Sequence, residues 1–116
     1  MKLFHLCAVS TWNQTGAEYR PASLESEGFV HLSTEAQWRL TAARFFRGQR
    51  ALVLLEVDSD ALGSGLRFER ADGDEFPHLY GALPRSAVLG VTPLAVSDDG
   101  EVTMFSERTE LLGSRG

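Results

Sequence analysis

The residues with the widest chemical range in this chain are its three histidines, His5, His31 and His78, each followed by leucine. Imidazole titrates near neutrality, offers a donor and an acceptor nitrogen, and ligates metals. If the fold brings the three rings together, they could form one site. A catalytic zinc ion with three histidine ligands is one possibility. The chain has no His-x-His or His-Glu-x-x-His sequence, however, so a metal-dependent hydrolase is the less favoured alternative and we expect no metal.

Two segments without helical or strand periodicity are expected to be ordered loops beside such a site. Residues 19–28 contain Pro and Gly and supply Arg20, whose guanidinium could hold an anion by two parallel hydrogen bonds. Residues 75–84 contain two prolines, which predict a rigid loop that packs against the core. The candidate site residues of this second loop are Glu75, His78 and Tyr80.

A helix is predicted after Ser33, because Thr34 and Gln37 have the spacing of a capping box. Its expected buried stripe consists of Trp38, Ala42, Phe45 and Phe46. The free amides at a helix start attract phosphate or carboxylate, so Ser33 together with Arg20 could bind an anion there. Glu35 opposes such binding, since it already supplies negative charge to the first turn.

The remaining pattern predicts strands separated by polar turns. Strands are expected at 2–8, 29–32, 51–57, 66–69, 88–96 and 102–105, a helical turn at 12–17, and polar turns at 70–74 and 98–100. Residues 1–105 are therefore expected to form a single α+β domain, with a mixed sheet of about five or six strands and one main helix. Residues 106–116 are expected to be a polar C-terminal tail.

Composition narrows the class of protein. The chain has 116 residues, 43% of them hydrophobic, which fits one compact domain. Its net charge of −5 argues against general affinity for nucleic acid, and no such partner is expected. Four arginines at helical spacing, Arg39, Arg44, Arg47 and Arg50, are interpreted as a solvated face or, less simply, as a contact for phosphate or an acidic partner. The single cysteine and the short apolar stretches indicate a cytoplasmic protein without a signal peptide or membrane span.

Four short sequences together resemble a known family. They are Phe4-His5-Leu6, Tyr19-Arg20-Pro21-Ala22-Ser23-Leu24, Glu27-Gly28-Phe29-Val30-His31-Leu32-Ser33 and Phe76-Pro77-His78-Leu79-Tyr80-Gly81. Over about residues 2–96 the chain is identified as similar to the bacterial domain-of-unknown-function family 952. The resemblance implies a fold similar to that of ADP-ribosyltransferases, whose split sheet binds NAD in a cleft.

The resemblance also implies roles for individual residues. His5 on the first strand would contact the NAD ribose, and His31 or Ser33 would support the nicotinamide side. Glu75, or His78 in its place, would meet the charge that develops at the ribosyl carbon. The chain departs here from the transferases, because it lacks their Ser-Thr-Ser and paired-tyrosine patterns and Ser33-Thr34 is only a partial match.

We therefore expect a cleft for NAD or a related ribosyl or phosphate ligand. The candidate catalytic residues are His5, Glu75 and His78, and the candidate cofactor-binding residues are His5, Arg20, His31, Ser33 and Tyr80. A non-catalytic module that binds a small molecule, a nucleotide or a partner protein is the main alternative. Catalytic activity and oligomeric state are left open by these residues.

Overall fold

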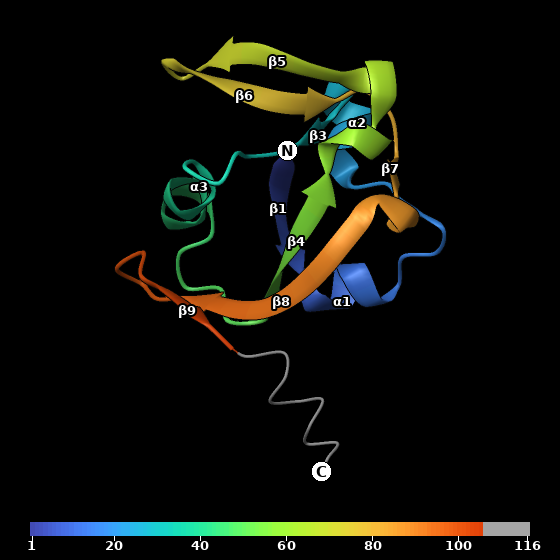
Figure 1. Ribbon diagram of the computed structural model, residues 1–116. Helices are drawn as coiled ribbons and strands as arrows, with labels where there is room; N and C mark the ends of the chain where they lie inside the picture. The colour runs from blue at the N-terminus through green and yellow to red at the C-terminus, as the bar shows by residue number, and fades with distance from the viewer. Residues whose placement is uncertain (106–116) are drawn as a thin grey trace.

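The computed structural model describes residues 1–105, and the predicted polar tail lies outside the described residues. In this part the chain forms nine strands in three sheets and three short α-helices (Figure 1). The four-stranded sheet has the order β1 (Lys2–Ala8), β4 (Leu52–Asp58), β8 (Val88–Val96) and β9 (Val102–Met104). The three-stranded sheet has the order β3 (Val30–His31), β6 (Asp74–Leu79) and β5 (Leu66–Ala71), and β2 (Glu18–Tyr19) pairs with β7 (Leu83–Pro84).

Strand β4 lies in the interior of the large sheet and is covered on both faces, as its nearly continuous apolar sequence predicts. Val53 and Leu55 face one buried cluster, which includes Trp12 and Tyr19. Leu54 faces a second cluster, which also contains residues of β1, β8 and helix α3. Because the strand contributes to both clusters, it is the structural centre of the domain.

The helices are short. They are α1 (Val9–Asn13), α2 (Ala22–Glu27) and α3 (Trp38–Phe45), with 3-10 turns at Ser59–Ala61, Gly63–Gly65 and Arg85–Ala87. Helix α3 packs against the large sheet through Trp38, which is 5% exposed, and Ala42, which is completely buried. At eight residues α3 is the longest helix of residues 1–105, and it is too short to cross a membrane.

The two larger sheets are joined at one point. Phe4 on β1 and Ser33, just after β3, exchange two backbone hydrogen bonds of 2.8 Å. Beyond this isolated bridge no further pairing joins the two sheets within residues 1–105, and Figure 1 shows α3 beside β1 and the β5–β6 hairpin across its end. The two larger sheets therefore share a single bridge of backbone pairing in the described part of the chain.

The α+β class is confirmed, with two differences in the sheet. Every strand pair between residues 1 and 105 is antiparallel, so the sheet is not mixed. The number of strands exceeds the expected five or six because three strands are only two residues long. Such short strands carry too little periodicity to be recognised from sequence.

Both predicted loops contain regular structure. Residues 19–28 contain the end of β2 and all of α2, and Gly28 ends that helix in the left-handed conformation. Residues 75–84 contain most of β6 and all of β7. The prediction of a rigid loop at 75–84 is wrong because Pro77 lies within a strand, where proline is uncommon.

The main helix begins later than predicted. Hydrogen bonds from the amides of Gln37 and Trp38 to the Thr34 carbonyl form a turn, and α3 starts only at Trp38. One half of the capping box is present, since the Thr34 amide donates to Gln37 Oε1 at 3.0 Å. The predicted burial of Phe45 is wrong: this side chain is 61% exposed. The helical turn predicted at 12–17 is α1, which starts and ends several residues earlier.

Candidate functional site

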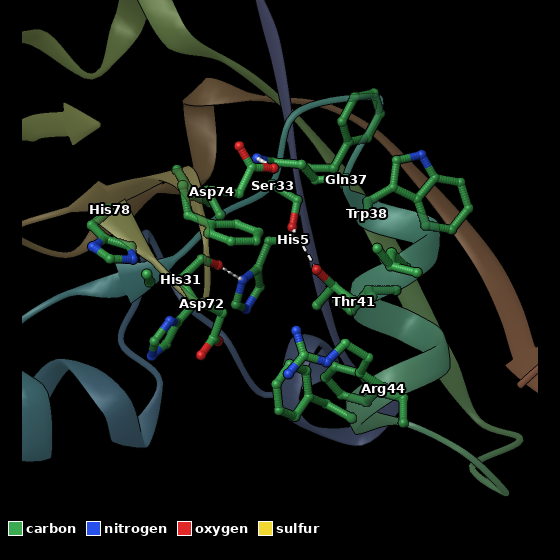
Figure 2. A pocket seen from close by; sticks show the side chains of 18 of the residues that line it. His5, His31, Ser33, Gln37, Trp38, Thr41, Arg44, Asp72, Asp74 and His78 are labelled. Atoms are coloured by element: carbon green, nitrogen blue, oxygen red, sulfur yellow. Dashed lines mark hydrogen bonds between the residues drawn. The ribbon is translucent and has the colours of Figure 1, made fainter. Parts of the chain in front are cut away.

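A cavity of about 680 Å³ opens where the sheets separate, between β1, α3 and the β5–β6 hairpin (Figure 2). More than half of the side chains that line it are aromatic or aliphatic, among them Phe29, Trp38 and Phe76. The polar lining residues are His5, Glu27, His31, Ser33, Gln37, Thr41, Arg44, Asp72, Asp74 and His78. A concave, largely apolar pocket of this size with a few convergent polar groups is typical of a small-molecule site.

His5 on β1 is hydrogen-bonded through both ring nitrogens. Its Nδ1 lies 2.6 Å from the carbonyl oxygen of His31, and its Nε2 lies 2.8 Å from the hydroxyl oxygen of Tyr19. Because a carbonyl only accepts, Nδ1 carries the proton and Nε2 accepts from the hydroxyl. Burial lowers the pKa of His5 to about 4, so the imidazole is neutral at neutral pH.

Tyr19 continues this buried polar chain into the core. Its side chain is 3% exposed and lies in the same cluster as Cys7. Burial raises the pKa of the Tyr19 hydroxyl and of the Cys7 thiol, so both groups keep their protons at neutral pH. Cys7 is therefore a small core residue, as its apolar surroundings in the sequence predict.

His31 and His78 are directly opposite each other on β3 and β6. Their ring centroids are 5.5 Å apart at an angle of 80°. Each ring donates to a different carboxylate: His31 Nε2 lies 3.1 Å from Glu27 Oε1, and His78 Nδ1 lies 2.8 Å from Glu69 Oε1. His31 is half exposed, whereas His78 is buried. The two imidazoles form an edge of the pocket and do not converge with His5 on one point.

Phe29 packs against His78 of this pair. Its ring stacks on His78 with centroids 4.0 Å apart and an angle of 21°. The Tyr80 ring also lies near Phe29, with centroids 5.2 Å apart, and its hydroxyl donates to Glu69 Oε1 at 2.6 Å. The hydrogen bond from Tyr80, followed by that from His78, holds the pKa of the Glu69 carboxyl below its usual value. Tyr80 thus shares the Glu69 carboxylate with His78 and is not among the residues that line the pocket.

Gln37 connects α3 to the β5–β6 hairpin across one end of the pocket. Its amide nitrogen donates to Asp74 Oδ2 at 3.0 Å and to the Glu75 carbonyl oxygen at 2.6 Å. Its amide oxygen accepts from the Thr34 amide. The bond from Gln37, followed by the bond from the Glu75 amide, lowers the pKa of Asp74. Figure 2 shows this connection above His5.

Helix α3 contributes two further polar residues to the pocket wall, Thr41 and Arg44. Ser33 Oγ and Thr41 Oγ1 are 3.3 Å apart, and Ser33 is buried. One turn further along the helix, Arg44 places its guanidinium at the pocket. Arg44 is the one cationic lining residue among residues 1–105 and opposes three carboxylates, those of Glu27, Asp72 and Asp74.

Four of the predicted site residues line the pocket: His5, His31, Ser33 and His78. Three predicted residues do not. Glu75 points away from the pocket because Asp74, Phe76 and His78 take the pocket side of β6, and neighbouring strand residues alternate between faces. Arg20 is exposed between β2 and α2, and the hydroxyl of Tyr80 is bound to Glu69 outside the pocket lining. The anion site at the helix start stays a prediction, and one of its amides, that of Thr34, already donates to Gln37 Oε1.

The structure adds six polar lining residues that are not among the predicted site residues: Glu27, Gln37, Thr41, Arg44, Asp72 and Asp74. Asp72 lies in the polar turn predicted at 70–74, which is the turn of the β5–β6 hairpin, but the sequence does not predict its place at the pocket. Thr41 and Arg44 are three residues apart on one helix, which places them on neighbouring positions of the same side. Nothing in the sequence alone indicates that this side faces a pocket.

Within residues 1–105, no three His, Cys, Asp or Glu side chains are grouped so that they could hold a metal ion. The separation of His5 from the His31–His78 pair is the structural reason. His5 is also engaged at both nitrogens, so neither one is available to a metal without losing a hydrogen bond.

Comparisons with known proteins agree over nearly the whole chain. A family model described as "Protein of unknown function (DUF952)" matches residues 6–91. The crystal structure of protein CC0527 from Caulobacter crescentus is 32% identical, with a TM-score of 0.81 over 99% of this chain and 97% of that chain. The solution structure of the same protein gives 32% identity and a TM-score of 0.73 over 94% and 95% of the two chains. None of the curated proteins matches. The likeness to ADP-ribosyltransferases stays a prediction.

Proposed function

The chain belongs to the DUF952 family of proteins of unknown function, and from the pocket we propose that it binds a small organic molecule of the ribosyl class, such as a nucleoside or the nicotinamide-ribose half of NAD. The observation that carries the proposal is the cavity of about 680 Å³, which combines apolar walls with hydroxyl-binding groups. Ligand pockets of roughly 300–1,000 Å³ enclose most of the surface of a molecule of this size.

The lining matches the two halves of a nucleoside. Phe29 and Phe76 offer aromatic surface to a flat heterocycle. Carboxylates bind sugar hydroxyls well because they only accept hydrogen bonds, and Asp72 and Asp74 supply them at the hairpin. Thr41 adds a hydroxyl from the opposite wall.

The charge of the pocket favours the nucleoside over a dinucleotide diphosphate. Three carboxylates and one guanidinium line it, so a pyrophosphate inside would meet more like charge than opposite charge. In this proposal NAD enters with its nicotinamide-ribose end, and its phosphates stay outside the pocket near Arg44. The cationic nicotinamide ring then lies on the acidic side.

The proposed role is binding, with His5 as part of the wall. Because both of its nitrogens are hydrogen-bonded, His5 can take up a proton at Nε2 only if its bond with Tyr19 reverses, so that the hydroxyl oxygen accepts. Glu75 is predicted from sequence to meet the positive charge that develops at a ribosyl carbon, but it does not line the pocket. In this proposal the carboxylate of Asp72, which does line it, has that role.

Isothermal titration of the full chain with nicotinamide riboside, adenosine, ADP-ribose and NAD tests this proposal. We expect the two nucleosides to bind with Kd values below about 1 mM, and ADP-ribose to bind no more tightly than adenosine. Amide chemical shifts should change at residues 29–46 and 71–78, which surround the pocket. No binding of any of the four compounds at millimolar concentration would contradict the proposal.

A specific observation supports a second function, that of a protein-binding module. Leu40 is 65% exposed and Phe45 is 61% exposed, and both lie on α3 at the pocket. Exposed apolar side chains that lie together are typical of interaction surfaces. Pull-down with the wild type and with the Leu40→Ser and Phe45→Ser variants tests this function: a partner lost with both substitutions supports it, and a partner kept by both argues against it.

A further inference from the structure

Two opposite charges face the pocket from different walls without being paired to each other. Arg44 lies on α3, and Asp72 lies in the turn of the β5–β6 hairpin. The ion pairs among residues 1–105 do not include them, so their charged atoms are more than 4.0 Å apart. Figure 2 shows the guanidinium and the carboxylate on opposite sides of the His5 ring.

The other carboxylates of the pocket are already engaged. Glu27 accepts from His31, and Asp74 accepts from both Gln37 and the Glu75 amide. By contrast, the carboxylate of Asp72 has no hydrogen-bond partner within residues 1–105. The nearest aromatic contact of Arg44 is the ring of Phe45, at 5.2 Å. The pocket thus offers one cationic and one anionic group, both available to a ligand.

The ring between these charges does not neutralise them. His5 is uncharged at neutral pH and hydrogen-bonded at both nitrogens, so it presents a polar but neutral surface. Aromatic and aliphatic residues make up most of the rest of the lining. Arg44 and Asp72 are both exposed residues, so solvent and salt screen each charge, and a bound ligand gains most from them at low salt.

We propose that the ligand of this pocket is a zwitterion with separated charges on an aromatic body: a cationic group that pairs with Asp72 and an anionic group that pairs with Arg44. The proposal rests on the proposed function of the pocket as a small-molecule site and goes beyond the nucleosides named there, because these carry no anionic group; within the ribosyl class it favours a ligand that carries both charges. The two charges fix its direction, because reversing the ligand would place like charges together.

Four ring compounds of similar size test the charge pattern: 4-(aminomethyl)benzoate as the zwitterion, benzylamine as the cation, benzoate as the anion and benzyl alcohol as the neutral compound. Their affinities for the full chain are measured by titration calorimetry and by amide shifts at pH 7.5 and low salt. The zwitterion is expected to bind about tenfold more tightly than either singly charged compound, and its advantage is expected to shrink at high salt.

Two substitutions separate the contributions of the walls. Asp72→Asn removes the negative charge and keeps a residue that suits a turn position with positive φ, here +52°. It is expected to weaken the zwitterion and benzylamine several-fold and to spare benzoate. Arg44→Gln is expected to weaken the zwitterion and benzoate and to spare benzylamine. Asp99→Asn, in the other Asp-Gly turn, and Arg50→Gln are matched controls that change the same net charge outside the pocket.

The outcomes distinguish failure of the zwitterion inference from failure of the proposed small-molecule site. Equal binding of all four compounds, or equal losses in the pocket variants and their controls, would overturn the zwitterion inference and leave the small-molecule site standing. Binding of nucleosides but of none of the four ring compounds would also overturn the inference alone. Absence of binding by every compound, nucleosides included, would overturn both.

Discussion

The most quantitative prediction concerns His5, whose neutral state the fold enforces. Its pKa is lowered to about 4 because burial disfavours the charged imidazolium. In the unfolded chain the same group has an ordinary pKa of about 6.5. Below that pH the unfolded state binds a proton that the native state does not, so the unfolding free energy falls as the solution is acidified.

The size of this effect follows from the two pKa values. His5 contributes its full share of stability above about pH 6.5 and loses it between pH 6.5 and 4. Proton linkage with these values gives a loss of about 2 kcal/mol by pH 5 and about 3 kcal/mol by pH 4, relative to pH 7. Such a loss is a large part of the roughly 5–15 kcal/mol by which small domains are stable.

His5→Asn is the variant that isolates the effect. The asparagine amide nitrogen can take over the bond from Nδ1 to the His31 carbonyl, and the new side chain does not titrate. Urea unfolding of both proteins, followed by the fluorescence of the buried Trp12 and Trp38, gives the unfolding free energy at each pH. All other titrating groups are shared, so the difference between the two proteins reports His5.

The expected result is that the stability advantage of the wild type over His5→Asn shrinks by about 2 kcal/mol from pH 7 to pH 5. Parallel pH curves within about 0.5 kcal/mol would refute the reasoning, since additivity fails by no more than this for independent groups. Observation of the His5 ring by NMR checks the cause directly: titration near pH 6.5 would show that burial does not hold the ring neutral.

Three further changes have expected effects on stability. Tyr19→Phe leaves Nε2 of His5 without its donor in a buried place and should lower the unfolding free energy by about 1–3 kcal/mol in urea. Gln37→Ala removes the connection between α3 and the β5–β6 hairpin, so amide hydrogen exchange at 71–76 should become faster while β4 is unaffected; unchanged rates would contradict the connecting role. Leu55→Ala leaves a void in the fully buried centre of β4 and should cost about 2–5 kcal/mol, which a thermal or urea transition measures.

Long strands are the part of this fold that the sequence predicts well. The expected range 88–96 is identical to β8, and 2–8 is identical to β1, because both are mainly apolar runs long enough to be recognised as strands. Strand β6 is missed because Pro77 has no amide hydrogen and normally argues against a strand. In the structure Pro77 accepts a bond from the Leu32 amide but cannot return one, and pairing with β3 ends at His31.

The sequence predicts some residues of the candidate site and misses others, and the difference has a physical cause. His5, His31 and His78 are found from sequence because imidazole is rare and chemically versatile. Arg44 and Asp72 have ordinary explanations in sequence, as a solvated helix residue and a turn residue, and only the tertiary arrangement places them at one pocket. Long-range packing decides which side of a helix meets a cavity, and residue spacing within one element carries no information about it.

The pocket exists because a side chain replaces a backbone bond between the two larger sheets. In an antiparallel ladder that continued from the pair of Phe4 and Ser33, the next hydrogen-bonded pair would be Leu6 with His31. Instead the His31 carbonyl accepts from the ring of His5. A ring spans a wider gap than an amide hydrogen, so the strands can separate without leaving this carbonyl unpaired. His5 therefore holds the split open, and the chemistry of the opening is left to the charged residues on its walls.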